Sequence, residues 1–340
     1  LAAGALALVV AGLGAAALLG GVGGDGDGSG DGQASLPAGQ TAERRPASVD
    51  ITREGLLTRP NALAIAAGQV WAVSNRTGDV ALVDAATGRT GARLNVGRGA
   101  SSIAAGFGSV WVTKETTQTL LRIDAGTRER VTGGAVEIGR PGRNVAVVTG
   151  ARAVWVGVRN ADPEDRAPEA VVKIDPSTRA QQTIAVAGGV QDLAVGAGAV
   201  WVSNRFDATV TRIRLSDGRQ DRVAVGDGPR GITVGEGAVW VASSLDDEIT
   251  RINPRSLQTR SIALNAIPER VTIGGGSLWV TAREAGRLIR IDVRTRRVLE
   301  RVETGARPYA LDVTRGRAVW LSILDDNGLQ RVRFSRPGRG

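Results

Sequence analysis

Residues 229–264 decide the fold, and they read PRGITVGEGAVWVASSLDDEITRINPRSLQTRSIAL. Four short apolar runs alternate with polar residues in this stretch, at 229–235, 238–243, 248–253 and 261–264. Gly, Pro or Asp residues bound each run, and a period of two is typical of strands and not of helices. The stretch therefore predicts four consecutive antiparallel strands.

The tryptophan in this stretch recurs along the chain. The seven tryptophans align at one place in a repeat, with spacings of 40, 44, 46, 39, 39 and 41 residues: Trp71, Trp111, Trp155, Trp201, Trp240, Trp279 and Trp320. Four-stranded units of this length cannot bury both faces alone, so they stack radially around a channel. We predict an all-β seven-bladed β-propeller of four-stranded antiparallel blades, in which each indole fills the space between neighbouring blades.

The ends of the repeat region indicate how the ring closes. The last unit contains only three strand patterns, at 308–313, 318–322 and 329–334, and leaves no room for a fourth. An orphan strand pattern at 47–52 precedes the first unit. We predict that 47–52 is the closing strand of the last blade and that the propeller spans 47–340.

A second recurring residue marks the end of the third strand in most units. It is an Asp or Asn that precedes small or turn-forming residues: Asp84, Asp124, Asp175, Asn253 and Asp292. Asp and Asn at such positions accept hydrogen bonds from their own backbone in Asx turns. We therefore interpret the series as structural and not as a calcium or catalytic series.

The first 24 residues contain only Leu, Ala, Val and Gly. Residues 1–24 predict a transmembrane helix or signal anchor, with a cleaved signal peptide or a buried helix as alternatives. Residues 25–46 are rich in Gly and Asp and predict a disordered linker. We expect a single-pass protein of the cell membrane with an extracytoplasmic propeller, or else a secreted protein.

Composition excludes several kinds of site. The sequence has no Cys, which removes disulfides and thiolate metal sites, and no His, which removes the commonest general base. A net charge of +9 favours a polyanionic partner, yet Lys114 and Lys173 are the only lysines among 43 basic residues. Codon bias toward Arg is the alternative explanation of this charge.

From about Ser48 onward the repeats resemble the YVTN-type, or YncE-like, β-propeller family. That family follows a Tyr-Val-Thr-Asn strand with a Val-x-x-Ile-Asp strand and a Gly-Pro step. Residues 201–204 (WVSN) and 111–114 (WVTK) match the first strand, and residues 121–124 (LRID) and 172–175 (VKID) match the second. Trp replaces Tyr throughout. The resemblance implies the fold and is compatible with sensors, scaffolds, receptor domains and single-strand DNA binders.

The virginiamycin B lyase family is a related group of seven-bladed enzymes. Those enzymes open a lactone ring with a His base and a Mg²⁺ ion that acidic residues bind. The absence of His disfavours this activity here. Acidic clusters at 246–248 and 325–326 follow the Trp strand, and either solvated loop charges or a hard-cation site would explain them. We expect no catalytic residue, no bound metal and no cofactor.

In propellers, the loops that lead into each blade and the loops between strands two and three open on one face, around the channel mouth. Arg recurs in these loops, so guanidinium groups could converge on an anion. The candidate binding residues are Arg59, Arg98, Arg143, Arg159, Arg205, Arg230, Arg270, Arg283 and Arg307, together with the loop aromatics Phe206 and Tyr309. Arg76, Lys114 and Arg140 belong to the same loops. Salt bridges to interleaved acids, such as Glu284, are the structural alternative.

These features favour a membrane-anchored, non-catalytic propeller that acts as a binding, sensor or scaffold domain. The expected partner is a protein, an anionic small molecule or a cell-envelope ligand, bound by a monomer. The absence of Met also allows this chain to be the sensor portion of a longer receptor, with a kinase or transcriptional regulator before Leu1. DNA binding is disfavoured because only Phe206 and Tyr309 could form a stacking platform.

Overall fold

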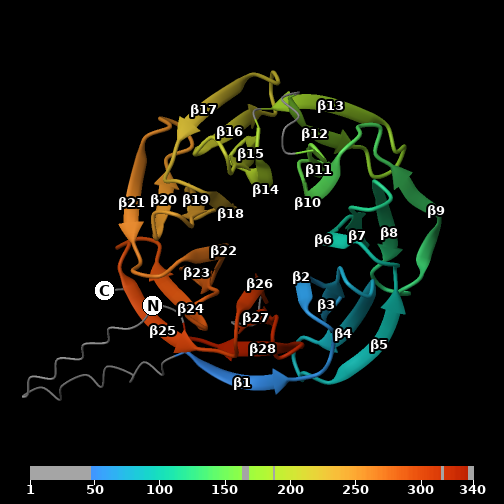
Figure 1. The fold of residues 1–340 in the computed structure, drawn as a ribbon, viewed down its shortest axis with the longest axis horizontal. Coiled ribbons are helices and arrows are strands. Elements are labelled where there is room, and N and C mark those ends of the chain that lie inside the picture. Colours follow the sequence, from blue (N-terminus) through green and yellow to red (C-terminus); the bar gives the residue numbers. More distant parts are fainter. Residues whose placement is uncertain (1–46, 163–167, 187, 315–317, 336–340) are drawn as a thin grey trace, which may run out of the picture. The chain divides into compact units, whose positions relative to one another are not determined.

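The computed structural model describes residues 47–162, 168–186, 188–314 and 318–335. These residues form seven four-stranded antiparallel sheets arranged as a ring, which confirms the predicted seven-bladed propeller (Figure 1). The predicted helix at 1–24 and the predicted linker at 25–46 lie outside the described residues. Within the described residues, no helix is long and apolar enough to cross a membrane.

Each blade runs from an innermost strand at the channel to an outermost strand at the rim. Blade 1 contains β2 (Pro60–Ala66), β3 (Gln69–Ser74), β4 (Asp79–Asp84) and β5 (Thr90–Asn95). Blade 2 contains β6 (Ala100–Gly106), β7 (Ser109–Lys114), β8 (Thr119–Asp124) and β9 (Arg130–Glu137). Blade 3 contains β10 (Arg143–Gly150), β11 (Ala153–Arg159), β12 (Glu169–Ile174) and β13 (Gln181–Val186). Blade 4 contains β14 (Val190–Gly196), β15 (Ala199–Asn204), β16 (Thr209–Arg214) and β17 (Gln220–Ala224). Blade 5 contains β18 (Pro229–Gly235), β19 (Ala238–Ser243), β20 (Glu248–Ile252) and β21 (Thr259–Ala263). Blade 6 contains β22 (Pro268–Gly274), β23 (Ser277–Ala282), β24 (Arg287–Asp292) and β25 (Val298–Glu303). Blade 7 contains β26 (Pro308–Val313), β27 (Ala318–Ile323), β28 (Gly328–Arg333) and β1 (Ser48–Arg53).

Blade 7 joins the two ends of the described chain. Strand β1 pairs antiparallel with β28, with Ser48 opposite Arg333, and a bulge follows Val49. Figure 1 shows this blue strand lying beside the red β28 at the rim. Asp50 at the bulge lies 2.7 Å from Arg331 and 2.6 Å from Arg333. The N-terminal strand thus supplies the fourth strand that the last repeat lacks.

The tryptophans occupy the interfaces between blades. All seven are at most 2% exposed, and each belongs to a separate apolar cluster. Trp240, for example, packs with Ile249 of its own blade and with Leu278 and Ile289 of blade 6. Each indole therefore fills the space between its blade and the next, where a large buried aromatic surface stabilises the stack.

Six of the seven indoles also carry a cation. The third-strand residue directly opposite the Trp is basic in blades 2 to 7, and its charge lies 5.1 to 5.9 Å from the ring centroid: Arg122, Lys173, Arg212, Arg251, Arg290 and Arg331. Some of these groups also reach the next blade, as when Arg212 donates to the Pro254 carbonyl at 2.8 Å. Part of the Arg content therefore stabilises blade stacking.

The recurring Asp and Asn residues form the turns between strands three and four. Asp175 accepts hydrogen bonds from the amides of Ser177 (2.8 Å) and Thr178 (2.7 Å), and Asp84, Asp124, Asn253 and Asp292 accept in the same way. These backbone hydrogen bonds hold the pKa of Asp175 below its usual value. The series therefore forms Asx turns, as predicted.

The strand order separates two faces. The loops between strands two and three and the loops into each blade open on one face, which we call the channel-mouth face. The turns between strands one and two and between strands three and four open on the other, which we call the turn face. The innermost strands of neighbouring blades contact one another around the channel. They bring side chains from distant repeats together.

Candidate functional site

The structure places all eleven predicted binding residues at the channel-mouth face. They lie at the start of an innermost strand, at the end of a second strand, or in the loop beside one: Arg59, Arg98, Arg143, Arg159, Arg205, Phe206, Arg230, Arg270, Arg283, Arg307 and Tyr309. They do not form one uniform ring, because carboxylates neutralise some of the guanidinium groups and leave others. Lys114 is buried and donates to the Val96 carbonyl at 2.9 Å, so it serves the fold.

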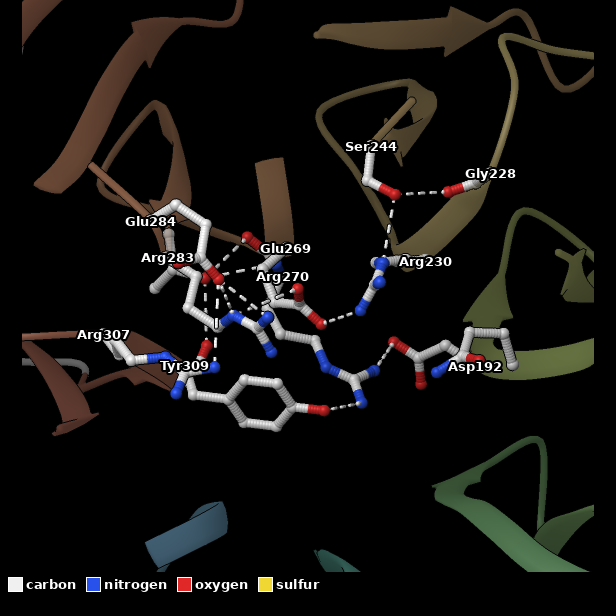
Figure 2. Close-up of polar contacts among 12 residues, drawn as sticks. Asp192, Gly228, Arg230, Ser244, Glu269, Arg270, Arg283, Glu284, Arg307 and Tyr309 are labelled. Carbon is white, nitrogen blue, oxygen red and sulfur yellow. Dashed lines mark hydrogen bonds and ion pairs between the residues drawn. The ribbon is translucent and has the colours of Figure 1, made fainter. Parts of the chain in front are cut away.

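The most buried charge at this face is Glu269 on β22, which is 2% exposed. Its Oε1 lies 2.7 Å from Nη1 of Arg230, and its Oε2 lies 4.0 Å from Nε of Arg283 (Figure 2). Arg230 also donates to Ser244 Oγ at 3.0 Å. A buried carboxylate is tolerated when it is paired and hydrogen-bonded in this way. Glu269 therefore neutralises part of the charge of Arg230 and Arg283.

Further ion pairs neutralise other predicted residues. They join Arg283 to Glu284 at 2.8 Å, Arg307 to Glu284 and Asp325 at 3.8 and 3.9 Å, and Arg143 to Glu115 at 3.1 Å. These pairs are partly exposed, so each contributes little to stability. They agree with the alternative that salt bridges account for part of the Arg series.

A salt bridge crosses the channel between blades 4 and 6. Nη1 of Arg270 on β22 lies 2.8 Å from Oδ2 of Asp192 on β14, and Nη2 lies 3.4 Å from the Tyr309 hydroxyl (Figure 2). The guanidinium also lies 5.4 Å from the centre of the Tyr309 ring. We call Asp192, Arg270 and Tyr309 the channel strap.

Gly231 of blade 5 makes the channel strap possible. Asp192, Gly231 and Arg270 occupy equivalent positions, each nine residues before the Trp of its blade. Blade 5 thus contributes no side chain at the level where Arg270 meets Asp192. A Cβ at Gly231 would also lie 2.7 Å from the Arg270 Cα, so the two innermost strands approach closely only because this residue is Gly.

The electrostatics of the strap follow from its position inside the ring. Burial raises the pKa of Asp192, and the positive charge of Arg270 opposes that rise. The amides of Leu193 and Ile232 also donate to Asp192, at 2.9 and 3.4 Å. The side chains of Arg270 and Asp192 keep 21% and 23% of their surface exposed to the channel. The pair is therefore accessible to a small polar molecule.

Beneath the strap the channel holds a cavity of about 150 Å³. Its polar lining comes from blades 1, 2, 4 and 6: Asn61, Ser101, Ser102, Asp192 and Arg270. Asn61 donates to the Ser101 carbonyl at 2.9 Å, which ties blade 1 to blade 2. The cavity offers hydroxyl, carboxylate and guanidinium groups, all of them hydrogen-bonding groups.

Another acid lines the ring at blade 7. Asp312 on β26 accepts hydrogen bonds from the amides of Ile65 in blade 1, at 3.0 Å, and Val313, at 2.8 Å. Burial raises the pKa of Asp312 to about 6, against the opposing effect of these hydrogen bonds. Asp312 therefore joins the last innermost strand to the first, and its charge changes in mildly acidic solution.

Four predicted guanidinium groups form no direct ion pair with a carboxylate of the described residues. Within the described ranges, no carboxylate lies within 4.0 Å of Arg59, Arg98, Arg159 or Arg205. Arg205 is partly buried. Burial and the charges of Arg230 and Arg159 lower its pKa. Phe206, the next residue in the same loop, is 67% exposed.

The acidic loops do not assemble a metal site in the part of the chain that the structure describes. No group of three or more Asp or Glu residues converges there with the geometry of a metal site. Asp246 instead accepts from the Asp227 amide at 2.7 Å, and Glu248 accepts from Thr250 and Ser261. Their hydrogen bonds hold the loop of blade 5.

Many solved structures share the fold. The chain is similar to a structure described as streptogramin B lyase, with a TM-score of 0.73 and 15% identity, over 85% of this chain and 98% of that one. It is also similar to hydrazine synthase of Kuenenia stuttgartiensis, with a TM-score of 0.71 and 12% identity, over 84% and 98% of the two chains. No family model and no curated protein matches the chain. The likeness shows the propeller fold, and the YVTN-type assignment stays a prediction.

Sequence reasoning missed the acidic half of the site. Asp192, Glu269 and Asp312 were not among the candidate residues, although each lies on an innermost strand. A signal for Asp192 existed, because its position is fixed relative to the Trp of its repeat. Comparing that position across the seven repeats would have revealed one Asp, one Gly and one Arg in successive blades.

Proposed function

We propose that the protein is a non-catalytic binding protein whose ligand site lies on the channel-mouth face around Arg205. The observation that carries this proposal is that Arg205 is partly buried near two further guanidinium groups and forms no direct ion pair with a carboxylate of the described residues. Removing a charge from water costs free energy unless an opposite charge compensates it. A bound anion would supply that charge.

The surroundings of Arg205 define the ligand further. Arg159 extends the positive region, and its Nη1 donates to Gln191 Oε1 at 3.1 Å. Phe206, the next residue in the loop, adds an exposed aromatic ring. An anion with an adjoining planar or apolar part would use both, because the ring offers stacking surface and the guanidinium a charge-assisted hydrogen bond.

The membrane-anchored, extracytoplasmic placement is part of this proposal. Its support is the uncharged apolar run at 1–24 followed by the Gly- and Asp-rich segment at 25–46. A propeller held outside the membrane would present the channel-mouth face to soluble anions or to cell-envelope ligands. The non-catalytic assignment is supported by the lack of His and Cys, which removes the commonest general base and the thiolate nucleophile.

Anilinonaphthalene sulfonate, an aromatic anion whose fluorescence rises on binding, is a direct probe. We expect it to bind the wild-type chain, and Arg205→Gln and Phe206→Ser each to weaken binding by about tenfold, the effect of losing one charged hydrogen bond or one stacking contact. Phe107→Ser is the matched control, because Phe107 is 41% exposed in a turn of blade 2 on the turn face. Equal losses in Phe107→Ser and Phe206→Ser would refute the site.

A further inference from the structure

A second cavity lies on the turn face, between blades 5 and 6. It has a volume of about 590 Å³, and four guanidinium groups line it: Arg251, Arg260, Arg294 and Arg296. Among the described residues, the lining has one acid, Glu236. The cavity is formed by the turns of two neighbouring blades, so it is separate from the channel-mouth site.

In blades 4 and 6, a carboxylate on the fourth strand pairs with the third-strand Arg that covers the Trp. In blade 4, Arg212 lies 2.6 Å from Asp221, which is directly opposite on the fourth strand. In blade 6, Arg290 lies 2.5 Å from Glu300, again directly opposite. The guanidinium group in these blades is therefore neutralised from the neighbouring strand.

Blade 5 differs from blades 4 and 6. Arg251 covers Trp240 at 5.7 Å from the ring centroid, but the residue directly opposite on the fourth strand is Arg260. Among the described residues, no carboxylate lies within 4.0 Å of either guanidinium group. Like charges directly opposite on paired strands destabilise a sheet. The pair thus leaves two adjacent positive charges at the wall of an open cavity.

The turn of blade 6 adds to this charge. Arg294 and Arg296 belong to the turn between β24 and β25, and both line the cavity. The Asx turn at Asp292 fixes the backbone there, because Asp292 accepts from the Arg294 amide at 2.9 Å. Guanidinium groups from two blades therefore face one space, held by rigid elements.

We propose that this cavity binds a phosphate-bearing ligand with two or more negative charges. Guanidinium groups pair bidentately with phosphate oxygens, and several groups around one space suit a polyvalent oxyanion better than a single charge. Binding would relieve the repulsion between Arg251 and Arg260, with which no carboxylate of the described residues forms an ion pair. The site takes the phosphate group itself, whether inorganic or on a sugar.

The variant Arg260→Glu tests this proposal without weakening the fold. It places a carboxylate opposite Arg251, as Asp221 lies opposite Arg212, so we expect the free protein to melt at a higher temperature than the wild type. Melting is followed by tryptophan fluorescence with inorganic pyrophosphate or glucose phosphate, at constant ionic strength. The wild type gains Tm with at least one of these probes, because a ligand that binds only the folded state stabilises it.

Controls separate the two sites. We expect Arg260→Glu to bind the probe that stabilises the wild type at least about tenfold more weakly than the wild type does. A tenfold loss corresponds to the loss of one charged contact. Arg219→Glu, an exposed charge reversal in the turn of blade 4, and Arg205→Gln at the channel mouth keep the response. A wild type that responds to neither probe overturns the proposal, as does an unchanged response in Arg260→Glu. A response lost only in Arg205→Gln would assign the anion to the channel mouth.

Discussion

Replacing Arg270 by Leu tests the channel strap. The guanidinium lies 2.8 Å from Asp192, and about four-fifths of each side chain is removed from solvent. Breaking a fully buried pair costs about 3–5 kcal/mol and breaking an exposed pair about 0–1 kcal/mol, so we expect Arg270→Leu to lower the free energy of unfolding by about 2–4 kcal/mol. Denaturant unfolding followed by fluorescence of the buried tryptophans measures this difference.

The same variant has a predicted pH dependence. Burial already raises the pKa of Asp192, and removing Arg270 removes the charge that opposes the rise. A carboxyl group whose pKa is raised in the folded state stabilises the fold below its unfolded pKa, and this stability is lost as pH rises through the folded pKa. The cost of Arg270→Leu should therefore be larger at about pH 8 than at about pH 4.

A double variant and an exposed pair serve as controls. Adding Asp192→Asn to Arg270→Leu removes the unpaired charge and should recover at least about 1 kcal/mol. Arg143→Leu breaks the pair with Glu115, whose side chains are 52% and 30% exposed, and should cost less than about 1 kcal/mol. Equal costs for Arg270→Leu and Arg143→Leu, or a cost of Arg270→Leu that does not change with pH, would refute the reasoning.

Three further changes test the packing of the ring. Gly231→Ala places a methyl group 2.7 Å from the Arg270 Cα and should cost about 1–3 kcal/mol in unfolding free energy. Gly188→Ala should not show this cost, because Gly188 has open space around it and no left-handed backbone. Trp240→Ala empties one blade interface and should cost about 3–5 kcal/mol, and a loss below about 1 kcal/mol would contradict the packing role. Burial raises the pKa of Asp312 to about 6. As pH rises from about 4 to about 7, the free energy of unfolding of the wild type should therefore fall by up to about 3 kcal/mol relative to that of Asp312→Asn. Identical pH profiles of the two proteins would show that Asp312 has an ordinary pKa.

The ring could be predicted because its determinants are local and repeated. One Trp per repeat marks the second strand of each blade, and the spacing between them counts the blades. The three strand patterns of the last repeat, with the orphan pattern before Trp71, indicated the fourth strand that β1 provides. Each of these signals lies within one repeat or at the ends of the array.

The site was harder to predict from the sequence because the residues that pair in it come from different blades. Arg270 and Asp192 are 78 residues apart, and their contact depends on ring closure and on the missing side chain at Gly231. Loop position identified the guanidinium groups but not the carboxylates that occupy Arg230 and Arg283. The basic residues over the indoles were also missed, because cross-strand register decides which residue faces each Trp.

The central claim is that an anion binds at Arg205 on the channel-mouth face. Amide chemical shifts of the isotopically labelled protein, recorded during titration with anilinonaphthalene sulfonate, test it most directly. We predict saturable shifts concentrated at Gly189, whose carbonyl accepts the Arg205 amide at 2.7 Å, and at Arg205 and Phe206. Shifts confined to the turn face, or no saturable shift at these three amides, would contradict the account.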